Sequence, residues 1–244
     1  MRRALERTTA CVRLPNASDI DRGPARLRGA AFLGLIALLL CPLAVRAQTL
    51  AALPSPTKIL AVTGKADPIR AWYGLCRDVP GECGINPAEL ATIALTPEVW
   101  QLLVRVNREI NESIQALSDR DHWGVEDRWN FPDDGAGDCE DIQLLKRKVL
   151  IGHGLPRRAM RMTVVLDEEG GGHAVMMVRT DRGDFILDNR RMSILPWTQT
   201  GYTYIKAEGQ DGMEWMSFGG AIAPIVTARN DEQPSGSTAR VASR

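Results

Sequence analysis

The hydrophobic pattern of this chain changes period once, and that change limits the class of fold. In residues 97–117 and 138–150, apolar side chains recur every three or four positions, as on the buried face of a helix. Gly154 and Pro156 then stop the helical pattern. From residue 160 onward, short apolar stretches alternate with turns that contain glycine. Helices followed by several antiparallel strands predict an α+β domain.

Local signals mark where these elements begin and end. Thr96 suits the cap of the first helix, because Pro97 and Glu98 follow it in the first turn. Asp181-Arg182-Gly183 is a tight turn that joins two strands into a hairpin. Between the helices lies an acidic and aromatic loop at residues 119–137, and so long a loop in a compact domain is typically functional. Strands are expected at residues 160–166, 173–180, 184–188, 202–206 and 214–218.

The N-terminus has the features of a targeting segment. An apolar run at residues 30–45 follows a stretch with three arginines, and small residues precede a cleavage position after Ala47. The run is short for a membrane span. Residues 1–47 are therefore expected to be a cleaved signal peptide, with an uncleaved membrane anchor as the alternative.

The rest of the chain divides by composition. Residues 48–70 contain several Pro, Ala and Thr without a strong periodicity and are expected to be a linker. Residues 71–226 contain the predicted helices and strands and all six tryptophans, so the packed domain is expected there. Residues 227–244 are polar and are expected to be disordered.

Signal cleavage would leave three cysteines, and their spacing sets one of them apart. Cys76 and Cys83 lie close together in a turn-rich stretch and suit a small disulfide loop in an oxidising compartment. Cys139 is then unpaired, which in an exported protein indicates a reactive thiol or an intermolecular bridge. The alternative is a buried, inert cysteine.

The neighbours of Cys139 favour the reactive thiol. Cys139 is expected in the first turn of the second helix, with Asp138 as N-cap and Asp141 at the acidic position of a capping box. The positive end of the helix dipole and the free backbone N–H groups favour a thiolate there. The same N–H groups would stabilise an oxyanion on an attacked carbonyl.

A reactive thiol needs a base, and His173 is the best placed of the three histidines. His153 lies at the far end of the same helix, about 20 Å away at a rise of about 1.5 Å per residue, and His122 lies in the preceding loop. His173 begins one strand of the hairpin and Asp188 ends the next. A two-residue turn would make these two diagonal neighbours, about 7–8 Å apart on one face. The alternatives are a structural histidine and an aspartate that belongs only to a turn.

The acidic side chains around the cysteine oppose a thiolate unless something neutralises them. Asp138, Glu140 and Asp141 flank the cysteine, and Asp133 and Asp134 precede it. Their charges would raise the pKa of the thiol. Several carboxylates in a glycine-rich loop suit a hard cation such as Ca²⁺, whereas zinc would need a Cys/His cluster of a different spacing. The alternative is that acids gather here because they favour a helix N-terminus.

Three separated motifs resemble the bacterial transglutaminase-like cysteine proteinases. They are DHWGVEDRW in the acidic loop, GDCEDIQLLKR at the second helix and GGHAVMMVRTDRGDFILDN in the hairpin, and the resemblance extends from Cys76 to Phe218. It implies a papain-like, transglutaminase-type α+β core, in which the nucleophile lies at a helix N-terminus packed on an antiparallel sheet. It also implies Cys139 as nucleophile, His173 as general base and acid, and Asp188 as the residue that orients the histidine.

The resemblance further implies Asp138, Glu140 and Asp141 as calcium ligands. The best-known members of the family are periplasmic, calcium-dependent proteases that cut large surface adhesins. A periplasmic location, an exported adhesin as substrate and an inner-membrane regulatory receptor are therefore expected. Ile142-Gln143 stand where the family often has an aromatic-alanine pair, which leaves the subfamily and the adhesin open.

Three functions remain open from the sequence. The first is a thiol protease, and the second is an amidase or acyl-transferase in which an amine replaces water at the same triad. The third is a non-catalytic binding module of the same fold. The balance of 30 basic and 30 acidic residues predicts no nucleic-acid partner.

Overall fold

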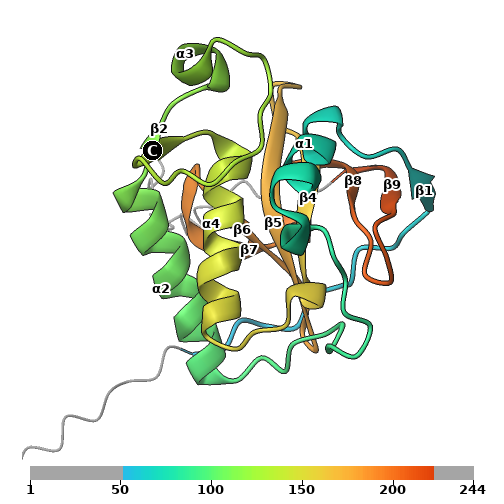
Figure 1. Ribbon diagram of the computed structural model, residues 1–244. Helices are drawn as coiled ribbons and strands as arrows, with labels where there is room; N and C mark the ends of the chain where they lie inside the picture. Colours follow the sequence, from blue (N-terminus) through green and yellow to red (C-terminus); the bar gives the residue numbers. More distant parts are fainter. Residues whose placement is uncertain (1–51, 223–244) are drawn as a thin grey trace, which may run out of the picture. The chain divides into compact units, whose positions relative to one another are not determined.

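The computed structural model describes residues 52–222, which form one mixed sheet-and-helix domain (Figure 1). The expected signal peptide at 1–47 and the expected tail at 227–244 lie outside the described residues. None of the helices within 52–222 is long and apolar enough to cross a membrane.

A seven-stranded antiparallel sheet forms the centre of the domain. Its strand order is β1-β9-β8-β4-β5-β6-β7, and each neighbouring pair is antiparallel. A separate short parallel pair joins β2 (Gln115–Ala116) to β3 (Ala136–Gly137). The strands of the large sheet are β1 (Gly64–Ala66), β4 (Met160–Leu166), β5 (Gly172–Thr180), β6 (Gly183–Asp188), β7 (Arg191–Pro196), β8 (Thr203–Glu208) and β9 (Trp215–Ile222).

Helices cover one face of this sheet and confirm the predicted α+β class (Figure 1). They are α1 (Arg70–Asp78), α2 (Pro97–Ser113), α3 (Asp119–Trp123) and α4 (Cys139–Gly152). The packing of α2 and α4 on the middle and one end of the sheet builds the largest core. Its buried members include Leu103, Val106, Leu150, Met160, Met176, Val178, Phe185 and Leu187.

Both long helices begin where local signals predicted, and α4 also ends there, whereas α2 ends at Ser113, before the expected limit at residue 117. The side chain of Thr96 accepts a hydrogen bond from the backbone N–H of Val99 (3.3 Å) and caps α2. Helix α4 starts at Cys139 and stops at Gly152, and Gly154 then adopts a positive φ of 86°. That conformation favours glycine and reverses the chain toward β4.

The β5–β6 hairpin has the predicted two-residue turn. Thr180 pairs with Gly183, and the ladder continues to Met176 opposite Leu187. Gly183 occupies a positive φ of 106°, and a Cβ there would lie 2.6 Å from the carbonyl oxygen of Thr57. The register of the strand that carries His173 is therefore set by a turn that only glycine can complete.

The structure corrects the expected linker at 48–70, because part of it belongs to the fold. Strand β1 pairs with β9 at one edge of the sheet. Leu60 is buried in the core cluster on the sheet face opposite the helices, and its N–H donates to the carboxylate of Asp184 (2.8 Å). A segment without a helical or alternating pattern can still pack against the sheet as extended chain, because its partners come from distant parts of the sequence.

Further elements were missed from the sequence, among them α1, α3 and β7. Residues 72–84 were expected to form only a disulfide loop. They begin instead with most of helix α1, which buries Trp72 and Leu75. The Cys76–Cys83 disulfide is present, with 5.5 Å between the Cα atoms. Short α3 and β7 also lack strong periodicity, and β7 forms by pairing with the preceding strand β6.

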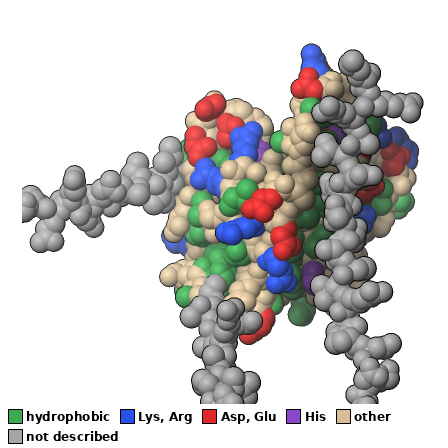
Figure 2. Space-filling model, turned by 90° about the vertical axis from the view of Figure 1, so that its left-hand side faces the viewer, with side chains coloured by type: hydrophobic (Ala, Val, Ile, Leu, Met, Phe, Trp, Pro, Cys, Tyr) green, Lys and Arg blue, Asp and Glu red, His purple; other side chains and the backbone are tan. Residues whose placement is uncertain are grey.

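The charge balance is visible on the surface. On the face drawn in Figure 2, basic and acidic side chains are interspersed and do not separate by sign. This distribution agrees with the absence of net charge in the full sequence.

Candidate active site

The N-terminus of α4 brings Cys139 against the start of β5. The Sγ of Cys139 accepts a hydrogen bond from the backbone N–H of Ala174 (3.4 Å), the residue that follows His173. The cysteine is free, as predicted, and half-buried. Asp138 is the N-cap residue by position, but its side chain makes no capping hydrogen bond to the helix. The predicted capping contact is absent because this carboxylate lies among other acids, described below.

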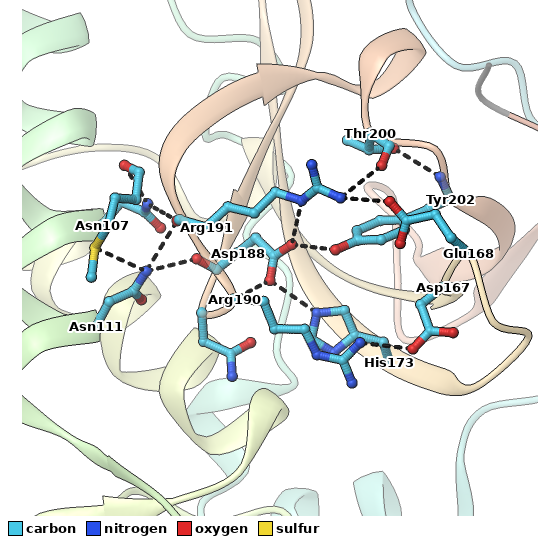
Figure 3. Close-up of polar contacts among 12 residues, drawn as sticks. Asn107, Asn111, Asp167, Glu168, His173, Asp188, Arg190, Arg191, Thr200 and Tyr202 are labelled. Carbon is cyan, nitrogen blue, oxygen red and sulfur yellow. Dashed lines mark hydrogen bonds and ion pairs between the residues drawn. The ribbon is translucent and has the colours of Figure 1, made fainter. Parts of the chain in front are cut away.

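His173 and Asp188 meet inside the domain, as the hairpin pattern predicted. The Nε2 of His173 donates to Oδ1 of Asp188 (2.9 Å), and both residues are almost fully buried (Figure 3). An ionised carboxylate can only accept, so Nε2 is the donor in this contact. The other ring nitrogen, Nδ1, is buried without a hydrogen-bond partner in the described part of the chain. It is therefore available to exchange a proton with a neighbouring group.

Two further groups hold the carboxylate of Asp188. The hydroxyl of Tyr202 donates to Oδ2 (2.6 Å), and the backbone N–H of Arg190 donates to Oδ1 (2.9 Å) (Figure 3). Burial opposes ionisation, yet the hydrogen bond and charge of His173, with these donors, keep the pKa of Asp188 below its ordinary value. Tyr202 also packs edge-on against the imidazole, with 5.8 Å between ring centroids. The sequence predicted Tyr202 only as the first residue of a strand at 202–206 and assigned it no role.

The thiol itself lies in an unfavourable electrostatic environment. Burial is the main cause that raises the pKa of Cys139, and the charge of Glu140 raises it further. The thiol donates a hydrogen bond to Oε2 of Glu140 (3.1 Å). The hydrogen bond from Ala174 acts in the opposite direction but does not compensate. Burial and the neighbouring acids thus raise the pKa of the thiol, whereas the helix dipole was expected to lower it.

The acids near Cys139 form a cluster larger than the predicted set. Oxygens of Asp119, Asp127 and Glu140 lie within 4.8 Å of one another, and so do those of Asp119, Asp138 and Asp141. Helix α3 and the following loop supply Asp119 and Asp127, which sequence reasoning did not single out. Their signal was the density of acids in the 119–137 loop.

Asp133 and Asp134, which the sequence placed near the cysteine, belong to neither group of carboxylates. Asp134 instead contacts Nε2 of His122 (2.8 Å), and Asp133 is exposed. His122 is thereby engaged away from the thiol. His153 is the residue at the C-terminal end of α4, opposite Cys139.

The cluster has the properties of a site for a hard cation. Burial, followed by the charge of Asp138, raises the pKa of Glu140 to about 9. Burial is also the first cause that raises the pKa of Asp141 to about 8, although Asn130 donates to it from its backbone N–H (2.8 Å). Oδ1 of Asp138 is buried without a partner in the described residues. Buried carboxylates that repel one another, with an unused oxygen, fit the oxygen ligands of Ca²⁺.

Comparison with known proteins places the chain in a family. No curated protein matches the sequence significantly. Among solved structures, calcium-bound LapG of Legionella pneumophila is 22% identical, with a TM-score of 0.43 over 52% of this chain and 73% of that one. A second structure of Legionella pneumophila LapG is 25% identical, with a TM-score of 0.42 over 48% and 68% of the two chains.

The family comparison covers far more of the chain. The sequence pattern of the bacterial transglutaminase-like cysteine proteinases matches residues 62–222, a range that includes Cys139, His173 and Asp188. It spans well over half of the 244 residues. The chain therefore belongs to the bacterial transglutaminase-like cysteine proteinases and is a cysteine protease.

Proposed function

We propose that this protease cleaves exported proteins with a triad of Cys139, His173 and Asp188. The observation that carries the proposal is the thiol held at the N–H of Ala174, next to a histidine whose Nε2 is engaged by a buried carboxylate. That arrangement leaves Nδ1 of His173 as the nitrogen that serves the thiol.

The reaction follows from these contacts. Nδ1 of His173 accepts the proton of the Cys139 thiol as Sγ attacks the peptide carbonyl. Backbone N–H groups in the first turn of α4 stabilise the negative charge that develops on the carbonyl oxygen. The imidazolium then gives its proton to the departing amine, which leaves a thioester. A water molecule, deprotonated by His173, hydrolyses the thioester and regenerates the thiol. Asp188 holds the imidazole orientation and stabilises its charged form throughout.

The acidic cluster would hold calcium through Asp119, Asp127, Asp138, Glu140 and Asp141. When bound, the ion supplies positive charge that offsets the repulsion of these carboxylates and lowers the pKa of the nearby thiol. Glu140 would then stay ionised and would not exchange a proton with Sγ of Cys139. The chain's own residues perform each proton transfer.

The setting of the reaction is also part of the proposal. The apolar run at residues 30–45 would export the chain to the periplasm. A large surface adhesin is the proposed substrate, and an inner-membrane receptor is the proposed regulator. Both follow from the resemblance of the motifs to the family.

The decisive experiment is incubation of the mature protein with exported adhesin fragments from the same cell, in the presence of calcium. Wild type should release defined fragments, and Cys139→Ala should release none at equal concentration. Glu109→Gln, at an exposed position of α2, should cleave at the wild-type rate. Cleavage by Cys139→Ala would refute the triad. Incorporation of an added amine in place of hydrolysis would identify an acyl-transferase instead.

A further inference from the structure

Asp188 is the last residue of β6, where the regular pairing of the sheet ends. The ladder between β5 and β6 ends at Met176 opposite Leu187, one residue short of Asp188. On the other side, Asp188 pairs with Arg191 of β7, but the register shifts between Ile186 and Asp188. The sheet alone therefore does not fix the orientation of the residue that bonds His173.

Helix α2 supplies the missing hydrogen bonds. The Nδ2 of Asn111 donates to the carbonyl oxygen of Asp188 (2.8 Å) and to that of Arg191 (3.1 Å). The Nδ2 of Asn107, one helical turn earlier, donates to the carbonyl oxygens of Arg191 (2.9 Å) and Met192 (3.2 Å). Figure 3 shows both amides directed from α2 at this turn. The two asparagines thus hold the chain from residue 188 to 192.

A buried lysine fixes the orientation of Asn107. The Nζ of Lys146 donates to Oδ1 of Asn107 (2.8 Å), and both residues are fully buried. The carbonyl oxygens of the turn can only accept, so the amide nitrogen faces the turn, and the contact with Lys146 holds the amide oxygen on the other side. Lys146 lies on α4, seven residues after Cys139. The helix that carries the thiol is therefore linked through α2 to the turn that carries Asp188.

The chemistry of Lys146 is unusual for a residue with only a structural role. Burial lowers its pKa to about 7, and the charge of Asp188 opposes that shift. Its hydrogen-bond partner is a neutral amide and not a carboxylate. An apolar residue of the same length would cost less to bury.

We propose that Lys146, Asn107 and Asn111 form a positioning network, which aligns Asp188 with His173 by holding the 188–192 turn to the helix of the nucleophile. This inference rests on the proposed function, because alignment matters only if His173 serves Cys139. The three are positioning residues, since none of them contacts the thiol or the imidazole. Their effect passes through the backbone of Asp188.

Lys146→Met is the most informative variant. It removes a buried charge and keeps the length of the side chain, but it leaves Oδ1 of Asn107 without its donor, so the protein should remain folded with little change in stability. Without the ammonium, the amide of Asn107 is free to rotate, and the turn loses a fixed donor. The alkylation rate of Cys139 by iodoacetamide at pH 7, followed at the Cys139 peptide by mass spectrometry, should fall by a factor of about ten to a hundred.

Asn107→Asp provides an independent variant. The new carboxylate keeps the contact with Lys146 but has no N–H to donate to Arg191 and Met192, so the alkylation rate should fall as in Lys146→Met. Glu109→Gln, an exposed change in the same helix, should alkylate at the wild-type rate. Variants that keep the wild-type circular dichroism spectrum and alkylate at the wild-type rate would overturn the network.

An NMR measurement separates this inference from the proposed function. The Nε2 proton of His173, shared with Asp188, should give a low-field resonance in wild type and in Glu109→Gln. It should shift or disappear in Lys146→Met and Asn107→Asp, whether or not the thiol proves reactive. An unchanged resonance in both variants would contradict positioning. Slow alkylation in wild type, together with the expected resonance changes, would instead count against the protease mechanism alone.

Discussion

The two halves of the site are stabilised in opposite ways. In the histidine half, the carboxylate of Asp188 accepts hydrogen bonds from His173, Tyr202 and the backbone of Arg190. In the acidic half, five carboxylates form two close groups of three that share Asp119, and one oxygen of Asp138 is buried without a partner in the described residues. Cys139 contacts Glu140 of the acidic half and the backbone N–H of Ala174, the residue after His173.

The two halves therefore differ in whether the fold itself supplies the groups that stabilise their charges. Donors fixed by the fold need no rearrangement when charge develops on the imidazole, so the histidine half is preorganised. Like charges cannot stabilise one another, so the acidic half takes up either protons or a cation. The fold therefore fixes the orientation of the proposed base, His173, whereas in the proposed function the pKa of the Cys139 thiol depends on whether the acids bind protons or a cation.

Breaking the histidine half should have the largest effect. Asp188→Asn replaces an acceptor with an amide and favours the wrong tautomer of His173, so we expect cleavage to slow by about 10⁴-fold. The initial rate on the adhesin fragment, at equal folded concentration, measures this. Asp133→Asn, at an exposed acid outside both carboxylate groups, should leave the rate unchanged. A wild-type rate in Asp188→Asn would mean that this carboxylate does not orient the base.

Binding of calcium to the acidic half should have the next largest effect, which is on the free energy of unfolding. Glu140 and Asp141 have folded pKa values of about 9 and about 8, above their unfolded values, so the cation-free protein loses stability as pH rises from about 4.5 toward 9. Calcium should therefore stabilise more at pH 8 than at pH 5.5. The gain is about 2.7 kcal/mol at a concentration one hundred times Kd.

The midpoint of thermal unfolding, with calcium and with EGTA at both pH values, tests this expectation. Glu140→Gln should reduce the calcium response, and Asp133→Asn should preserve it. Equal midpoints with calcium and EGTA at pH 8 would show that the acids bind no calcium under these conditions.

Removing one donor from the histidine half should have a smaller effect. Tyr202→Phe loses the hydrogen bond to Asp188 (2.6 Å), at a cost of about 1.5 kcal/mol, and cleavage should slow roughly tenfold. Because Tyr202 helps to keep the pKa of Asp188 low, its loss raises that pKa. On acidification, the variant should lose activity at a higher pH than wild type. A pH–rate profile that coincides with wild type would exclude this role.

A change outside both halves should have the smallest effect. Thr96→Ala removes the cap of α2 and should cost about 1 kcal/mol of unfolding free energy, measured by urea denaturation. The cap lies three turns from Asn107 along α2, so cleavage by the folded protein should keep the wild-type rate. A large loss of rate in folded Thr96→Ala would show that the position of the whole helix controls Asp188.

The sequence by itself determined the elements whose signals are local. The cap at Thr96, the apolar face of α4 and the turn before Gly183 depend on residues within a few positions of one another. These signals were enough to predict Cys139 at a helix start and the hydrogen-bonded pair of His173 and Asp188. A two-residue turn fixes the strand register, and the register fixes which side chains share a face.

Only the tertiary structure decided which distant groups complete the site. It brought Asp119 and Asp127 to the acids beside Cys139, and it turned Tyr202 toward Asp188. It also paired the expected linker with β9. Such contacts join residues far apart in sequence, and no local propensity encodes them, because their free energy comes from burial and hydrogen bonding once the core has formed.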